Sequence, residues 1–458
     1  MNRVLLGIIV LFIVSCNRAQ ENVSPTAILI SDVSIVDVRT GNILQGQQIV
    51  IDSGKIKKIS GVVENPEDYT LQINGNGKFA LPGLAEMHAH IPSPDTPRER
   101  IEETLFLYLS NGITTIRGML GHPSHLEMRA KAAAGGLLSP RIFTSSPSLN
   151  GNSIQTPEEA RNKVTAYHQA GYDFLKIHPG IKREVFDELV RTANEVGIEF
   201  SGHVPVDVGI RHALESRYAS IDHADGFLEG LVPESENVNS GENGFFGYNF
   251  TGLADTGKID ELVQLARENE VWIVPTQSLF ERWFAPTDTE ELLSQPEMRY
   301  MPAATLSEWK QRKEQSTGPG TGFDATQWKT FDAIRMQLLK SLQDKGHGML
   351  LGSDAPQLFN VPGFSIHHEM AGMERAGLTP LQILQSGTMN PAIFFGLEDT
   401  FGEIREGLDA DILLVDSNPL DDLAALKQLS GVMVRGTWLD RAAIVRKLDE
   451  IASNAAGQ

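Results

Sequence analysis

Six residues of metal-ligand type stand at the ends of short apolar runs in this chain: His88, His90, Lys176, His203, His223 and Asp354. A short apolar run bounded by polar residues is typical of a buried strand in a parallel sheet. Parallel β/α barrels build their active sites from side chains at the C-terminal ends of the strands. Four imidazoles, one carboxylate and one lysine at such positions are the groups that two divalent cations would need.

The order of apolar runs and amphipathic stretches predicts an α/β fold of the (β/α)8 barrel type from residue 81 to 399. Barrel strands are expected near 83–88, 113–117, 140–145, 173–177, 198–203, 219–223, 271–275 and 348–353. Helices ending at glycine are expected at 103–112 and 183–197. The stretch from about 226 to 345 holds only one expected strand, so we expect a long insertion that forms a lid over the strand ends.

The spacing of the first two histidines, His88 and His90, is informative. Residues i and i+2 of a strand point to the same side, so both imidazoles can bind one ion. A single buried histidine is more often a hydrogen-bonded core residue. The ordered series that continues with Lys, His, His and Asp, each closing an expected strand, favours a metal centre instead.

This series resembles the amidohydrolase superfamily, in its binuclear branch with a bridging lysine. Segments 28–60 and 390–420 look like the two halves of the small β-sandwich domain of that family, which implies a composite domain from residues 27–80 and 400–445. The motifs GITTIRG (112–118), SGHVP (201–205) and AGLTPLQILQSGTMNPA (376–392) are similar to imidazolonepropionase-like and prolidase-like members. The resemblance covers roughly residues 26–445.

The resemblance implies two ion sites, each with its own ligands: His88, His90 and Asp354 for one ion, and His203 and His223 for the other. Zinc suits imidazole and carboxylate ligands best, and manganese, cobalt and iron are also compatible. Lys176 is implied as a bridge between the ions, as a carbamate that forms when its neutral amine adds carbon dioxide. The alternative for this lysine is a stem packed in the barrel with its charge in solvent.

The implied reaction is hydrolysis of a carbon–nitrogen bond by a hydroxide that bridges the two ions. Asp354 is the expected catalytic residue, which takes a proton from the nucleophile and delivers it to the leaving nitrogen. The expected substrate is a dipeptide or an N-acyl amino acid, and opening of a cyclic amide is the alternative. A different class, a non-catalytic surface lipoprotein that binds a small molecule, has no need of a proton shuttle such as Asp354.

Arg117 follows the second expected strand and is the candidate for binding a substrate carboxylate through its two-pronged guanidinium. A structural salt bridge is the alternative for this residue. The net charge of −20 disfavours a nucleic-acid partner, because phosphate binding needs a basic surface.

The N-terminus has the features of an export signal. The apolar run from Val4 to Val14 is too short to span a bilayer but fits the centre of a signal peptide. The four residues Ile13-Val14-Ser15-Cys16, which end this segment, resemble a bacterial lipobox. A plain signal peptide with an incidental cysteine is the alternative. We therefore expect residues 1–16 to be a signal peptide with a lipobox, in which Cys16 is lipidated and becomes the new N-terminus, and residues 17–26 to be a tether. The protein is then expected to be an exported lipoprotein, anchored to the membrane on the periplasmic or cell-surface side.

Overall fold

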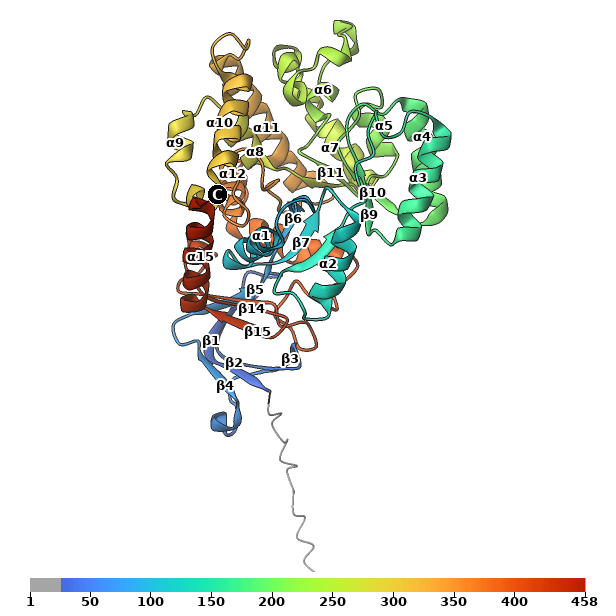
Figure 1. Cartoon of the computed structure of the whole chain (residues 1–458). Helices are drawn as coiled ribbons and strands as arrows, with labels where there is room; N and C mark the ends of the chain where they lie inside the picture. Colours follow the sequence, from blue (N-terminus) through green and yellow to red (C-terminus); the bar gives the residue numbers. More distant parts are fainter. Residues whose placement is uncertain (1–25, 458) are drawn as a thin grey trace, which may run out of the picture.

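The computed structural model describes residues 26–457. A sheet built from both ends of the chain lies below a group of parallel strands and helices (Figure 1). The expected signal peptide, the Cys16 lipobox and all of the tether but its last residue lie outside the described residues, so these features stay predictions. Within residues 26–457, no helix is both long enough and apolar enough to cross a membrane.

Seven parallel strands carry or precede the residues of interest: β6 (Leu84–Ala89), β7 (Ile113–Gly118), β8 (Arg141–Thr144), β9 (Phe174–Ile177), β10 (Glu199–Gly202), β11 (Ser220–Asp222) and β12 (Trp272–Val274). They form two sheets with the orders β6-β7-β8 and β12-β11-β10-β9. Each strand begins and ends within one residue of the limits expected from the sequence. Apolar runs bounded by polar residues were therefore a sufficient signal for these seven strands.

Single parallel bridges connect the two sheets at both of their edges. Ser145, beyond β8, pairs with Phe174 of β9 on one side. On the other side, the segment 349–355 pairs with β12 through Met349 and with β6 through Ala355. The eighth expected strand, 348–353, is therefore not a regular strand but a link with isolated bridges. Gly352 is needed in this link, because a Cβ there would lie 2.8 Å from the backbone nitrogen of His88.

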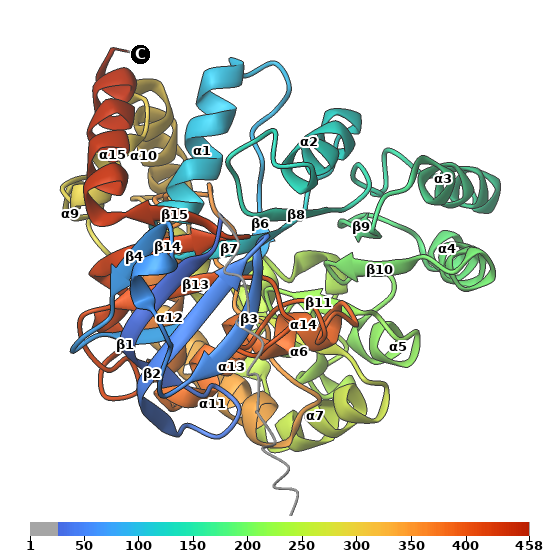
Figure 2. The ribbon, with the colours of Figure 1, turned by 90° about the horizontal axis from the view of Figure 1, so that it is seen from below.

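Helices follow the strands and lie around the outside of them (Figure 2). The first five are α1 (Arg98–Ser110), α2 (Pro123–Ala133), α3 (Pro157–Ala170), α4 (Arg183–Val196) and α5 (Ile210–Glu215). The expected helix at 183–197 is confirmed as α4, which buries Val185, Phe186 and Leu189 and ends at Gly197 with φ 75°. Glycine adopts this left-handed conformation without a Cβ clash, so the helix stops there.

The stretch from 226 to 345 is mainly helical: α6 (Phe227–Gly230), α7 (Ile259–Glu268), α8 (Gln277–Leu279), α9 (Thr289–Leu293), α10 (Ala303–Thr317) and α11 (Ala325–Lys345). A π-helical turn, Phe280–Phe284, continues α8. Three further helices follow the bridge segment: α12 (Ser365–Arg375), α13 (Pro380–Gly387) and α14 (Met389–Phe394). The chain then returns to the sheet at the bottom of the molecule (Figure 1).

The lower sheet has eight strands, five from the N-terminal part and three from the C-terminal part: β1 (Ile28–Val36), β2 (Ile43–Asp52), β3 (Lys55–Ser60), β4 (Leu71–Asn74), β5 (Phe79–Pro82), β13 (Ile412–Val415), β14 (Leu429–Val434) and β15 (Thr437–Asp440). The two parts meet where β5 pairs with β13 in antiparallel register, with Ala80 opposite Leu414. Ile30, Ile49 and Ile412 belong to one apolar cluster that joins both parts. The last helix, α15 (Arg441–Ala456), packs against α1 and β14.

Candidate metal centre

All six expected ligands line one cavity of about 490 Å³. Their positions on the strands explain why they converge. His88 and Lys176 are the next-to-last residues of β6 and β9, and His203 and His223 come directly after β10 and β11. Because these strands are parallel, their C-terminal ends lie on the same side, and side chains there face a common space.

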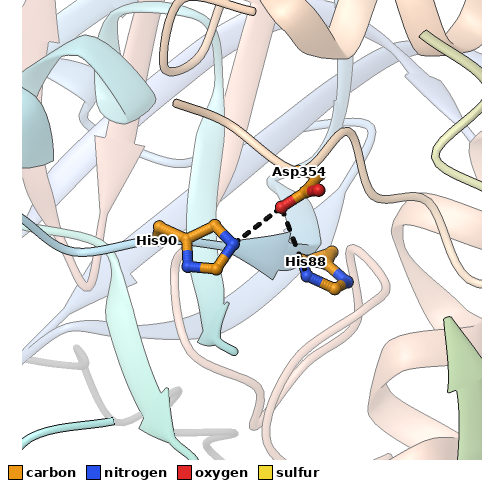
Figure 3. A group of neighbouring side chains, drawn as sticks. All are labelled: His88, His90 and Asp354. Carbon is orange, nitrogen blue, oxygen red and sulfur yellow. Dashed lines mark hydrogen bonds and ion pairs between the residues drawn. The ribbon is translucent and has the colours of Figure 1, made fainter. Parts of the chain in front are cut away.

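Three of the side chains lie close enough to share one ion (Figure 3). His90 Nε2 lies 2.6 Å from Asp354 Oδ1, and His88 Nε2 lies 3.3 Å from the same oxygen. The candidate ligand atoms of the three residues all lie within 4.8 Å of one another. Burial lowers the pKa of His88 to about 4, so its imidazole is neutral at pH 7, the form that binds metals. His88, His90 and Asp354 are therefore a candidate site for one divalent cation.

The carboxylate of Asp354 is held in a defined place and charge state. Its backbone nitrogen donates to the His88 carbonyl at 3.0 Å, and His90 N donates to the Ala355 carbonyl at 2.8 Å. Burial by itself would raise the pKa of Asp354, but His88 and His90 outweigh that effect, and the pKa lies below its usual value. The carboxylate is thus ionised at neutral pH and can act as a ligand or accept a proton.

The other two histidines are held by hydrogen bonds at their Nδ1 atoms. His203 Nδ1 lies 3.0 Å from Asp225, and His223 Nδ1 lies 2.8 Å from Thr276 Oγ1. The two rings are 4.6 Å apart between centroids. Partners at Nδ1 orient an imidazole and leave its Nε2 for a metal, as second-layer partners of metal-binding histidines do. Two imidazoles alone are few ligands for a cation, so a cation at this pair would need a further ligand.

Lys176 is the residue best placed to supply that ligand. Its side chain is buried, and within the described residues its Nζ has no hydrogen-bond partner. The carboxylate of Asp222 lies 3.5 Å away, within ion-pair range but beyond a normal hydrogen bond. Burial lowers the pKa of Lys176 and outweighs the attraction of Asp222 and Asp354. An amine with this environment is more readily neutral and reactive than a surface lysine.

Three residues of the centre have strained backbones. His223 and Asp354 have φ 64°, and Thr276 has φ 46°. Non-glycine residues rarely occupy this left-handed region, which costs about 1–3 kcal/mol, and such residues cluster at functional sites. The strain indicates that the positions of these side chains are kept at the expense of a low-energy backbone conformation.

Arg117 does not line the cavity, and the prediction that it binds a substrate carboxylate is corrected. The side chain is fully buried beneath the centre. Its nitrogens donate to the Met87 carbonyl at 2.7 Å, to Ser220 Oγ at 2.9 Å and to Asp222 Oδ1 at 2.9 Å. All three nitrogens of the guanidinium make hydrogen bonds within the protein, and the side chain is fully buried away from the cavity, so a substrate carboxylate in the cavity does not reach it. The structural salt bridge that was the alternative is what the fold contains.

Asp222 is a residue of the centre that the sequence analysis missed. One oxygen binds Arg117, and the other lies 3.3 Å from His88 Nδ1 and 3.5 Å from Lys176 Nζ. It therefore links the buried arginine to two expected ligands. The alternation of side chains along a strand could have indicated Asp222, because Ser220 and Asp222 lie on the same side of β11. Asp225 and Thr276 were also missed, and no motif marked them.

We expect Arg117→Met to reduce stability and not substrate affinity. Removing one partner of a buried ion pair leaves Asp222 with one charge partner fewer, and such changes typically cost about 3–5 kcal/mol in the free energy of unfolding. Arg98→Met, which removes an exposed pair with Glu102, is the matched control and should change it by less than about 1 kcal/mol. Denaturant unfolding of both variants measures this. An unchanged stability together with a raised KM would restore the substrate-binding role.

The wall of the cavity beside the expected metal ligands comes from the 226–345 stretch. Phe245, Phe246, Leu279 and Trp283 line it with apolar surface. The ring of Phe246 lies 5.3 Å from that of His223, between centroids. The expected lid stretch thus contributes one side of the same cavity that holds the six ligand-type residues.

The profile of the amidohydrolase family matches residues 79–439, which is most of the chain. The protein therefore belongs to the amidohydrolase family, and the suspected superfamily is confirmed. The name of this family describes enzymes that hydrolyse amide carbon–nitrogen bonds. These enzymes usually bind divalent metal ions, in keeping with the His88–His90–Asp354 group.

The matches to known proteins described here cover between 25% and 94% of this chain. The ochratoxinase of Aspergillus niger is 29% identical over 118 residues, which are 25% of this chain and 24% of that enzyme. The match thus spans about a quarter of that curated relative. Among solved structures, bottromycin amidohydrolase matches with a TM-score of 0.72 and 22% identity over 94% of this chain and 91% of that one. A putative prolidase from Bifidobacterium longum has a TM-score of 0.65 and 22% identity, over 93% and 98%. These two structures share the fold.

Proposed function

We propose that the protein is a metal-dependent hydrolase that cleaves the amide bond of a dipeptide or an N-acyl amino acid. The observation that carries this proposal is the convergence of six ligand-type side chains from five separate segments on one cavity. The cavity volume of about 490 Å³ lies in the range of small-molecule sites. The fold shared with a putative prolidase and with bottromycin amidohydrolase supports amide chemistry.

The architecture that we propose for this activity is a (β/α)8 barrel over residues 81–399 with a lid at about 226–345. Support comes from the pairing of β6 through β12 and back to β6 by way of the segment 349–355. We further propose that residues 27–80 and 400–445 form a composite β-sandwich, supported by the apolar cluster that joins both ends of the chain. A barrel of this kind would present all the ligands at one rim.

His88, His90 and Asp354 would hold one cation, and zinc is the first candidate because imidazole and carboxylate ligands suit it. His203 and His223 would hold a second cation through the Nε2 atoms that their hydrogen bonds leave free. Bound divalent cations would acidify a water molecule and polarise the carbonyl of the scissile amide. The residues fit this use, since the imidazoles are oriented and the buried Nζ of Lys176 has no hydrogen bond within the described residues.

Lys176 would join the two cation sites as a carbamate. Its neutral amine nitrogen adds to the carbon of carbon dioxide and loses a proton, which leaves an anionic group with two oxygen ligands. The pKa of this lysine, lowered by burial, supports a neutral amine. The carbamate would supply the further ligand that the His203–His223 pair needs.

Asp354 would carry the proton during hydrolysis. Its ionised carboxylate accepts a proton from the attacking water and then donates it to the amide nitrogen as the carbon–nitrogen bond breaks. His88 and His90 favour the ionised form before the reaction, and their contacts at 3.3 and 2.6 Å keep the carboxylate oriented toward the cavity.

We expect the zinc-loaded protein to hydrolyse members of a panel of dipeptides and N-acyl amino acids, and a chelator to abolish the activity reversibly. His203→Asn should lower kcat/KM by at least about 10²-fold, because an essential ligand is lost, while the folded circular dichroism spectrum stays unchanged. His168→Asn, at an exposed position of α3, is the matched control and should have no effect. Metal-independent turnover, or full activity of His203→Asn, contradicts the proposal. Turnover of cyclic amides alone would favour the alternative substrate class.

A further inference from the structure

The wall of the cavity beside the expected metal ligands carries a cation with no assigned role. Among the described residues that line the cavity, Arg312 of α10 is the only arginine. Its nearest acidic neighbour in the described part of the chain is Glu308, at 3.6 Å, which is too long for a hydrogen bond. Both side chains are well exposed, at 43% and 62%, and such pairs contribute little. The guanidinium is therefore available to another anion.

Arg312 is also held in place. Its guanidinium carbon lies 5.1 Å from the centroid of the Trp283 ring, in cation–π range. Trp283 Nε1 donates to Ser316 Oγ at 3.0 Å, and Ser316 Oγ donates to the Arg312 carbonyl at 2.9 Å. These two hydrogen bonds connect Trp283, in the π-helical turn, to the turn of α10 that carries Arg312.

A buried lysine next to Arg312 strengthens this connection. Lys313 Nζ donates to the carbonyls of Arg282, Trp283 and Ala285 at 3.1, 3.1 and 2.8 Å. The side chain of Lys313 is almost fully buried, so these bonds tie α10 firmly to the end of the π-helical turn. Arg312 therefore stands on a supported wall rather than on a free surface helix, and less entropy is lost when it binds a ligand.

Aromatic rings cover the wall beside this arginine. The Phe245 ring lies 5.3 Å from Trp283 and 4.9 Å from Phe246, between centroids. Phe246 in turn lies 5.8 Å from His203. The aromatic surface thus runs from the metal ligands to Arg312. An amino acid bound in this cavity would therefore meet both an apolar surface and a cation on the same wall.

We propose that Arg312 recognises the free carboxylate of the substrate, and that Phe245, Phe246 and Trp283 hold an aromatic or large apolar side chain of the same amino acid. This inference rests on the proposed function and refines it to amides of hydrophobic amino acids with a free carboxylate on the leaving side. Arginine suits this role because its planar guanidinium binds a carboxylate through two parallel hydrogen bonds. Arg312 takes the role that Arg117 was expected to have.

The test compares substrates with and without the carboxylate. N-Acetyl, N-benzoyl and alanyl derivatives of L-phenylalanine are paired with the same derivatives of 2-phenylethylamine, which lack only the carboxylate, and release of the primary amine is measured. We expect the zinc-loaded wild-type chain to prefer the carboxylates in kcat/KM by about 10- to 100-fold, as charged hydrogen bonds of this kind contribute. Arg312→Met should remove this preference by raising KM for the carboxylates, and leave kcat/KM for the 2-phenylethylamine derivatives unchanged.

Two further variants sharpen the test. Arg312→Lys keeps the charge but not the two-pronged geometry and should retain only part of the preference. Lys310→Met removes another cation of α10, one that pairs with Glu290 and does not line the cavity, and should retain all of it. A preference that is absent from the wild type, or that survives in Arg312→Met, overturns this inference alone. If the wild type hydrolyses no member of the panel, the proposed function fails and the inference fails with it.

Discussion

Asp354→Asn is expected to lower kcat by about 10²- to 10⁴-fold, the contribution usual for a general acid–base residue. Asparagine has nearly the same shape, but it can neither accept the proton from water nor deliver it to the leaving nitrogen. The change also weakens the ligand group with His88 and His90, because a neutral amide replaces a carboxylate. Steady-state kinetics on the best substrate of the panel measure the loss, and metal analysis of the same sample separates it from loss of a cation.

Asp332→Asn is the matched control for this variant. It makes the same chemical change at a carboxylate that pairs with Arg375 and does not line the cavity. We expect its kcat to equal that of the wild type. A variant at position 354 that keeps its metal and its full kcat would remove Asp354 from the proton path and assign the shuttle to another group.

Lys176→Met is expected to reduce the metal content from two ions to at most one for each chain and to lower kcat/KM by about 10²- to 10³-fold, since several kcal/mol of charge stabilisation are lost. Without metal, the variant should be at least as stable as the wild type. Methionine fills similar volume, and it removes a buried amine that has no hydrogen bond within the described residues. Metal analysis and thermal unfolding of the metal-free proteins measure both effects.

The carbamate itself has a direct readout. Protein loaded with metal in the presence of ¹³C-bicarbonate should show a carbamate carbon signal by NMR that Lys176→Met lacks. Lys313→Met is the control, because it removes a second buried lysine, one that does not line the cavity. This control should keep both ions and the signal. Two bound ions in Lys176→Met would show that the lysine does not bridge them.

The strands and their polar ends could be predicted because both depend on local sequence. Burial on both faces requires a continuous apolar run, and the seven strands from β6 to β12 follow such runs closely. The segment 348–353 has the same pattern but pairs only through isolated bridges, and Gly352 within it passes close to the backbone of His88. No property of the segment alone reveals that neighbour, which lies far away in the sequence.

Local sequence did not predict which of two arginines lines the cavity. Arg117 and Arg312 are the same residue type, and Arg117 had the better position in the sequence, at the end of an expected strand. Tertiary packing buried Arg117 and placed Asp222, Ser220 and the Met87 carbonyl within hydrogen-bond distance of its three nitrogens. Arg312 lies in a helix of the insertion, where no periodic signal points to a cavity.

The sequence by itself determined the family, the α/β alternation and the six ligand-type residues, because strand period and strand polarity are local properties that each short segment carries. Only the tertiary structure decided which polar groups serve those residues and which face the cavity. Asp222, Asp225 and Thr276 come to lie beside the expected ligands through contacts between different strands. The physical reason is that hydrogen bonding and desolvation depend on neighbours in space, and these are set only when the chain closes around its core.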